Sequence, residues 1–136
     1  MLIHSLLIGG LALAAAAPAA KRNLQVDDLF RIRAVGDPQL SHDGRWVAYT
    51  VATSSLKEDK AETRVWMTSI DGGEPLAMTA AGTSASRPRF SPDGKFLAFL
   101  AARPGEGESS DDAKAQVWLL DRRGGEAQRL TEMPQG

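Results

Sequence analysis

The chain repeats one sequence pattern, and this repeat limits the folds that it can adopt. The segment PQLSHDGRWVAY at residues 38–49 returns as PRFSPDGKFLAF at residues 88–99, an offset of 50 residues. A second block, residues 65–79, returns at residues 117–131 with an offset of 52 residues. Short apolar runs that recur about every fifty residues, separated by Asp-Gly or Gly-Gly turns, are typical of β-propeller blades. A propeller does not close on two blades, so the repeats predict a piece of a larger protein.

Each repeat is predicted to form four strands, because Asp-Gly and Gly-Gly pairs mark tight turns between its apolar runs. The predicted strands are 38–40, 46–51, 64–69 and 75–78, then 88–90, 96–101, 116–120 and 127–130. The fold class is therefore all-β: two four-stranded antiparallel blades of an incomplete β-propeller, preceded by a signal peptide and a short helix. The expected divisions are a signal peptide (1–20), a lead-in segment with the helix (21–36), blade one (37–80) and blade two (81–136).

The second strand of each repeat carries apolar residues without alternation, as in the runs WVAY and FLAFL. A strand with one solvent-exposed face should alternate apolar with polar residues. These strands are therefore expected to be covered on both faces, as they would be in stacked blades. Residues 52–63 and 102–115 then form long linkers between the second and third strands. The acidic stretch 105–112 is interpreted as a solvated surface loop. A calcium-binding loop is the alternative, although the spacing of the carboxylates fits no EF-hand.

The first twenty residues differ in composition from the rest. An uninterrupted run of Leu, Ile, Gly and Ala covers residues 6–17, and the triplet Ala17-Pro18-Ala19 fits the small-residue rule for signal-peptidase cleavage. The run is short for a transmembrane helix, which needs about 20 apolar residues. No Lys or Arg precedes it, which is atypical, and an uncleaved anchor is the alternative. The sequence predicts a periplasmic or secreted protein.

The lead-in segment is predicted to hold a helix. Asp27 is placed to act as its N-cap, and the apolar positions Leu29, Phe30 and Ile32 follow with helical spacing. The residues 36–38, Gly-Asp-Pro, should end this helix because the residue before a proline avoids the helical region.

Charge and composition exclude several kinds of partner and site. The chain has 16 Lys and Arg against 17 Asp and Glu, a formal net charge of −1, so no attraction to nucleic acid or, beyond the signal peptide, to membranes is expected. It has no cysteine, which excludes disulfides, a thiol nucleophile and thiolate metal sites. Trp66 and Trp118 recur at equivalent positions and are expected in the blade core rather than in a ligand site.

The motifs that support catalysis are incomplete. The nearest match to the Gly-x-Ser-x-Gly nucleophile elbow surrounds Ser84, but it lacks the closing glycine and a strand-to-helix context. His42 is the only histidine outside the leader, and it precedes Ser84, the wrong order for an α/β-hydrolase triad. One histidine and no cysteine cannot supply the ligands of a transition-metal site unless the site is built from carboxylates alone. No catalytic, cofactor-binding or metal residue is therefore assigned, and no cofactor is expected.

Several of these residues together resemble a known family. The elements are Asp28-Leu29 with Ile32, the run Asp37-Pro38-x-Leu40-Ser41-x-Asp43-Gly44, and the second-repeat residues Pro88, Phe90, Ser91-Pro92-Asp93-Gly94, Val117-Trp118, Gly124-Gly125-Glu126 and Leu130-Thr131. They look like the start of exported members of the prolyl oligopeptidase family, in its dipeptidyl- and acylaminoacyl-peptidase branches. The resemblance covers residues 24–131, and its most specific part is the helix leading into Asp-Pro-x-Leu-Ser.

That resemblance implies a two-part enzyme in which a propeller limits access to a C-terminal hydrolase with a Ser-Asp-His triad, so that short peptides are cleaved. The catalytic domain lies outside this sequence, and peptide substrates are the expected partners through that domain. The alternative is a non-enzymatic periplasmic propeller that binds a protein partner, as in the Tol system. Two blades alone should also expose apolar faces, expected to carry Trp46, Tyr49, Phe96 and Phe99, and should self-associate.

Overall fold

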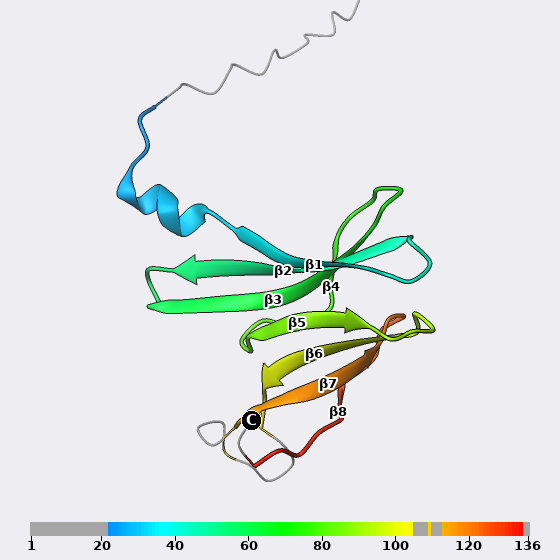
Figure 1. Ribbon diagram of the computed structural model, residues 1–136. Coiled ribbons are helices and arrows are strands. Elements are labelled where there is room, and N and C mark those ends of the chain that lie inside the picture. Colours follow the sequence, from blue (N-terminus) through cyan, green and yellow to red (C-terminus); the bar gives the residue numbers. More distant parts are fainter. Residues whose placement is uncertain (1–21, 105–108, 110–112, 135–136) are drawn as a thin grey trace, which may run out of the picture.

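The computed structural model describes residues 22–104, 109 and 113–134 as one short helix and two stacked sheets (Figure 1). The helix η1 (Val26–Arg31) precedes the first sheet, whose strands are β1 (Ala34–Leu40), β2 (Trp46–Ser55), β3 (Lys60–Ser69) and β4 (Leu76–Ala77). The second sheet has β5 (Ala85–Phe90), β6 (Phe96–Ala102), β7 (Ala115–Asp121) and β8 (Gln128–Arg129). In each four-stranded sheet, neighbours in sequence pair antiparallel.

This architecture confirms the predicted fold class of two four-stranded antiparallel blades that do not close into a ring. We call β1–β4 blade 1 and β5–β8 blade 2. Repeated residues take equivalent places: Tyr49 lies opposite Trp66 in blade 1, and Phe99 lies opposite Trp118 in blade 2. The predicted signal peptide lies outside the described residues.

The turn between the first two strands of each blade shows why Ser-x-Asp-Gly is repeated. In blade 1 the Ser41 hydroxyl donates to Asp43 Oδ1 at 2.5 Å and accepts the Trp46 amide at 2.9 Å. The same carboxylate oxygen accepts the Arg45 amide, and Gly44 has the positive φ of 69° that closes the turn. These hydrogen bonds favour the charged carboxylate and lower the pKa of Asp43, chiefly through Ser41.

Blade 2 repeats this network with its own residues. Ser91 Oγ donates to Asp93 Oδ1 at 2.6 Å and accepts the Phe96 amide at 3.0 Å. The pKa of Asp93 is lowered as well, first by the Ser91 hydroxyl and then by the Lys95 amide. A second contact is repeated within each blade, between the third strand and a threonine that follows the fourth. Thr79 Oγ1 accepts the Val65 amide at 3.1 Å in blade 1, and Thr131 Oγ1 accepts the Val117 amide at 3.0 Å in blade 2.

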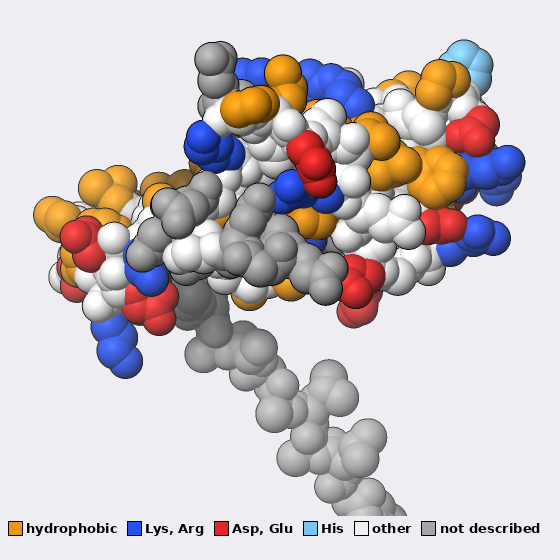
Figure 2. Space-filling view, turned by 90° about the horizontal axis from the view of Figure 1, so that it is seen from below, with side chains coloured by type: hydrophobic (Ala, Val, Ile, Leu, Met, Phe, Trp, Pro, Cys, Tyr) orange, Lys and Arg blue, Asp and Glu red, His pale blue; other side chains and the backbone are white. Residues whose placement is uncertain are grey.

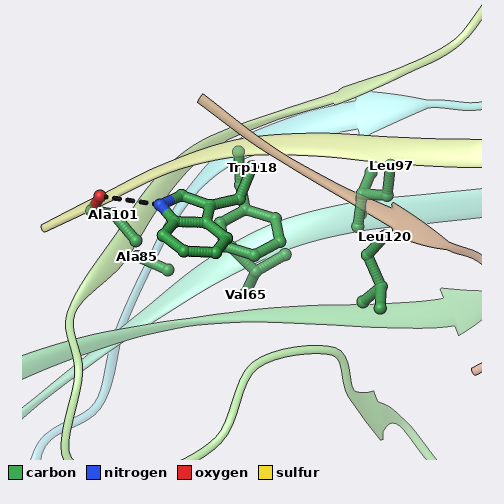
Figure 3. Close-up of a cluster of buried hydrophobic side chains, with 8 residues drawn as sticks. Val65, Ala85, Leu97, Ala101, Trp118 and Leu120 are labelled. Atoms are coloured by element: carbon green, nitrogen blue, oxygen red, sulfur yellow. Dashed lines mark hydrogen bonds between the residues drawn. The ribbon is translucent and has the colours of Figure 1, made fainter. Parts of the chain in front are cut away.

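The hydrophobic core lies between the two blades (Figure 3). Blade 1 contributes Ala48 and Val65, both fully buried, and blade 2 contributes Leu97, Phe99 and Trp118 among others. The Trp118 indole N–H donates to the Ala101 carbonyl at 3.1 Å, so the buried ring has no unmet donor (Figure 3). Along β6, half-buried residues alternate with buried ones, beginning with half-buried Phe96 and buried Leu97. In these two blades the second strands are thus fully covered only on the face toward the other blade, and cover on both faces remains a prediction for a longer stack of blades.

Two of the four aromatic residues expected on open faces lie elsewhere. Phe99 is 2% exposed and belongs to the core between the blades. Trp46 of blade 1 carries the guanidinium of Arg122 from blade 2 over its ring, 5.5 Å from the centroid, so it also lies at the junction. That prediction is therefore wrong for Phe99 and Trp46. Tyr49 and Phe96 are half-buried on the faces turned away from the junction.

The linker predicted at residues 52–63 is instead a long hairpin. β2 extends to Ser55 and β3 begins at Lys60, with Ser55 opposite Lys60 in the ladder. The segment carries few apolar residues, which is why its sequence resembles a loop, but the antiparallel ladder continues through it with mostly polar side chains on both faces. In blade 2 the ladder ends at the Ala102–Ala115 pair.

The lead-in segment also departs from expectation. The helix is of the 3-10 type, its N-cap is Gln25 rather than Asp27, and Asp28 accepts the Gln25 amide in return at 2.9 Å. It ends at Arg31, so Gly36 and the two residues after it do not terminate it. They lie within β1, which begins at Ala34 and not at residue 38.

Candidate functional site: the bulged inner strands

The two blades approach each other most closely around one strand. β5 contacts β1, β2 and β3 of blade 1, and both β1 and β5 are edge strands of their sheets. Because β1 and β5 also contact each other directly, they occupy the same margin of the two-blade stack, which we call the inner edge. In a closed propeller, inner strands of this kind surround the central axis.

Both inner strands carry a bulge at the same place in the repeat. The register shifts between Gly36 and Gln39 in β1 and between Ser86 and Arg89 in β5. At each bulge the residue before the proline has a positive φ, 44° at Asp37 and 53° at Arg87. Aspartate tolerates this left-handed conformation, whereas arginine pays a steric cost there. Bulges of this kind re-aim side chains beside functional sites, and their repetition marks the inner edge as the candidate site.

An ion pair crosses the inner edge at these bulges. Arg89 of blade 2 lies 3.1 Å from Asp37 Oδ1 of blade 1 and 3.2 Å from the other carboxylate oxygen. Gln39 donates to the same Asp37 Oδ1 at 2.9 Å, and Arg89 also donates to the Pro88 carbonyl at 2.7 Å. The pair is partly exposed, so its contribution to stability is small, about 0–1 kcal/mol. It positions the two inner strands more than it stabilises them.

Arg87 gives this margin a second guanidinium. It is exposed, and among the described residues it has no ion-pair partner. Contacts join Asp37, Gln39 and Arg89, and Arg87 lies two residues before Arg89 on the same strand. We call these four residues the inner-edge cluster; it carries two guanidinium groups and one carboxylate. Such a cluster can bind carboxylates or carbonyl oxygens by charge-assisted hydrogen bonds. It has no general base beside a nucleophile, so it is suited to binding and orienting rather than to bond cleavage.

The residues considered for nucleophilic chemistry lie far apart in the fold. Ser84 directly precedes β5, is exposed, and accepts the Thr63 amide on its hydroxyl at 3.2 Å. His42 lies in the turn between β1 and β2, at the opposite end of the strands. The structure therefore does not bring these two side chains together. Trp118 lies in the core as expected, while its equivalent Trp66 is half-buried on an outer face under the Arg64 guanidinium.

The described part of the chain has neither a metal-binding cluster nor a membrane-spanning helix. Within residues 22–104, 109 and 113–134, no group of three or more His, Cys, Asp or Glu side chains is arranged to hold a metal ion. Most of the acidic stretch 105–112, the alternative calcium loop, lies outside that part. No helix in the same part is long and apolar enough to span a bilayer.

The inner-edge cluster has no recognisable motif in the sequence. Asp37 belongs to a Gly-Asp-Pro segment that indicates the end of a helix, and Arg89 stands where the first repeat has a different residue, Gln39. The available signal was the alignment of the repeats, which places Asp37 and Arg87 at equivalent positions before a proline. It did not reveal the positive φ, because a residue before proline is normally extended.

Comparisons with known proteins agree on one family. The family model described as "Acylamino-acid-releasing enzyme, N-terminal domain" matches residues 43–119. An uncharacterized peptidase of Bacillus subtilis, YuxL, is 32% identical over 116 residues, covering 85% of this chain and 17% of that protein. Dipeptidyl-peptidase 5 of Porphyromonas endodontalis is 33% identical over 78 residues, covering 57% of this chain and 11% of that protein. The chain thus spans less than a fifth of the length of these curated relatives.

Solved structures show the same fold. An acylaminoacyl peptidase of Pyrococcus horikoshii aligns with a TM-score of 0.58 and 27% identity, over 76% of this chain and 15% of that one. The β-propeller domain of the Trilobed protease from Pyrococcus furiosus aligns with a TM-score of 0.55 over 75% of this chain and 28% of that domain. At 24% identity, the second likeness concerns the fold alone.

Proposed function

Because this chain belongs to the family of the acylamino-acid-releasing enzyme N-terminal domain, as the propeller portion of a prolyl oligopeptidase-type peptidase, we propose that it helps to select peptides for a serine-peptidase domain in the whole protein. The two blades are the first part of a ring, and its channel admits short peptides and excludes folded proteins. Hydrolysis takes place in the other domain; this chain contributes the wall of the path that leads to it.

One observation carries this proposal beyond the family: the paired bulges place charged residues, Asp37 and Arg87, at the same position of the two inner strands. Blade packing alone requires neither a positive φ at Arg87 nor an exposed guanidinium there. A channel wall that handles peptides needs such groups, because peptides offer carbonyl and carboxylate oxygens. The Asp37–Arg89 pair then fixes the distance between the first two blades at the channel.

The test uses the whole protein. A fluorophosphonate probe should label one serine outside this chain, and short fluorogenic peptides should be hydrolysed faster than long ones. Replacing both partners, with Asp37→Ser and Arg89→Ser, should loosen the inner edge and raise kcat/KM for long peptides relative to short ones. Lys57→Ser, in the exposed turn between β2 and β3, is the matched control and should leave the ratio unchanged.

Two results would refute the proposal. If the whole protein shows neither labelling nor peptidase activity, the chain belongs to a propeller without enzymatic function. If activity is present but the ratio for long and short peptides is the same in the double variant and in Lys57→Ser, the inner edge has no part in selection.

We also propose that the protein is exported to the periplasm or secreted, with residues 1–20 as its leader. The support is the apolar run 6–17 followed by Ala17-Pro18-Ala19. Mass spectrometry of the protein recovered from outside the cytoplasm should find its N-terminus at Ala20 or Lys21. Recovery of the chain with Met1 in place would show that the leader is not cleaved.

A further inference from the structure

The chain contains three Asp-Gly pairs, each in a tight turn between neighbouring strands. They are Asp43-Gly44, Asp71-Gly72 and Asp93-Gly94. Figure 2 shows basic and acidic side chains gathered at the end of the molecule that carries a histidine, and the only described histidine is His42 of the first of these turns. In an Asp-Gly pair the glycine amide nitrogen can attack the aspartate side chain, because glycine has no Cβ to obstruct the approach. The local structure of each turn decides whether this attack takes place in the folded protein.

In two of the three turns the aspartate carboxylate is held by hydrogen bonds. Asp43 Oδ1 accepts the Ser41 hydroxyl at 2.5 Å and the Arg45 amide at 3.2 Å. Asp93 Oδ1 accepts the equivalent hydroxyl and amide at 2.6 Å and 3.1 Å. These bonds, the serine hydroxyl first, favour the charged carboxylate and lower the pKa of both aspartates. Attack by the glycine nitrogen needs the neutral carboxyl, whose hydroxyl leaves as water, so both turns are protected.

The turn at Asp71 lacks this protection. The Asp71 side chain is exposed, and among residues 22–104, 109 and 113–134 no donor is bonded to its carboxylate. The turn does contain Ser69, but its hydroxyl accepts the Asp71 amide at 3.2 Å. The Gly72 amide donates to the Ser69 carbonyl at 3.2 Å, against 2.9 Å for the glycine amides of the other two turns. Gly73 follows, and a Cβ on either glycine would meet nothing within 4 Å, so the backbone here is free to rearrange.

We propose that Asp71 is a site of spontaneous modification, at which aspartate is converted to isoaspartate through a cyclic imide with Gly72. The Gly72 nitrogen bonds to Asp71 Cγ, and the amide proton and the hydroxyl of the neutral carboxyl leave as one water molecule. Water then adds back to one of the two imide carbonyls. Opening the bond from nitrogen to Cγ restores aspartate. Opening the bond from nitrogen to the main-chain carbonyl carbon gives isoaspartate, in which the chain runs through Cγ and the α-carboxylate is free.

The reaction needs neither an enzyme nor an oxidant, and it leaves the mass of the chain unchanged. Each of the three turns is closed by bonds within its own blade, so their order of reactivity does not depend on which blade faces are covered. The inference concerns the ageing of the chain and is independent of the proposed peptidase role.

The test compares the three turns within one sample of the whole protein, incubated in warm neutral buffer and then digested with trypsin. Cleavage after Lys and Arg, but not before proline, places the three pairs on separate peptides, 34–45, 65–89 and 90–95. Isoaspartate is measured by an isoaspartyl methyltransferase with labelled S-adenosylmethionine, and is located by fragmentation in a mass spectrometer. Peptide 65–89 should contain at least about tenfold more isoaspartate than either other peptide, because the held carboxylates must first lose their hydrogen bonds. In protein kept unfolded in urea, the three peptides should reach similar levels, since each is an Asp-Gly pair.

Three variants test the cause. Ser91→Ala removes the hydroxyl that holds Asp93, and should raise isoaspartate in peptide 90–95 toward the level at Asp71. Ser69→Ala is the matched control: it removes a turn hydroxyl that does not bind a carboxylate, and should leave peptide 65–89 at least as reactive and peptide 90–95 unchanged. Asp71→Arg introduces the residue that blade 2 carries at the equivalent position, Arg123, and should abolish labelling between residues 65 and 89. Circular dichroism checks that each variant is folded.

Three outcomes would overturn the proposal. The first is an equal isoaspartate content in the three peptides of the folded protein. The second is a folded protein that forms none at Asp71 while the unfolded protein does. The third is a folded Ser91→Ala variant in which the reactivity of Asp93 is unchanged.

Discussion

Replacing Trp118 by alanine is expected to lower the free energy of unfolding by about 3–5 kcal/mol, the range for large aromatic side chains deleted from a core. Trp118 is 8% exposed, packs in the cluster that joins the blades, and donates its indole N–H to the Ala101 carbonyl. Its removal leaves a cavity between the sheets and an acceptor that has lost a partner. Urea denaturation followed by far-ultraviolet circular dichroism measures the change.

The repeat supplies a matched control for this prediction. Trp66 occupies the equivalent strand position in blade 1 but is half-buried, with the Arg64 guanidinium 5.3 Å from its ring centroid. Trp66→Ala should cost about 1–2 kcal/mol, because less area leaves the core and the cation–π contact is a weak one. If the two substitutions cost the same in the monomer, the core is not where the structure places it. The measurements are made at the lowest practical protein concentration, so that self-association does not bury the outer face that carries Trp66.

Val65→Asp is expected to be the second large effect. The Val65 side chain is completely buried between the blades in a cluster of apolar residues, and the Arg103 guanidinium at that cluster is already placed over the Trp118 ring, 4.9 Å from its centroid. An unpaired charge at such a site costs about 3–5 kcal/mol, or else the carboxyl is neutralised by a raised pKa. The two blades should separate, and the near-ultraviolet circular dichroism of Trp118 should be lost at neutral pH.

The control is again the equivalent residue. Val117→Asp places the same carboxylate on the half-buried outer face of blade 2, where water can reach it, and should cost about 1 kcal/mol or less. The near-ultraviolet spectrum should survive. A Val65→Asp protein that keeps this spectrum would mean that the two blades do not pack on each other through Val65.

The repeat predicted the sheets, their strand order and the tight turns, because these depend on local chemistry. Ser41 and Asp43 form the same hydrogen bonds as Ser91 and Asp93, and such bonds are made between residues close in sequence. The predictions that were wrong depend on longer-range packing. Phe99 and Tyr49 are equivalent in sequence, yet one is in the core and the other on an outer face, because only one side of each blade has a neighbour.

The strand ends and the candidate site could not be predicted from the sequence either. The outer half of the β2–β3 hairpin is polar on both faces, so hydrophobic periodicity gave no sign of its extent. The bulges at Asp37 and Arg87 were hidden because their left-handed conformation precedes a proline, where extended backbone is the rule. The Asp37–Arg89 contact joins residues from different repeats, and no local pattern reveals such a pair.

The strictly sequential strand order affects how the chain folds. Every strand pairs with its neighbour in sequence, so each blade can form from local hairpins without waiting for a distant segment. Blade 1 is complete at Ala77 and can acquire its hydrogen bonds while later residues are still being synthesised. Its Ala48 and Val65 then stay exposed until residues 97–120 arrive to cover them. During that interval the nascent chain is most vulnerable to aggregation, which makes the speed of blade 2 formation a determinant of folding yield.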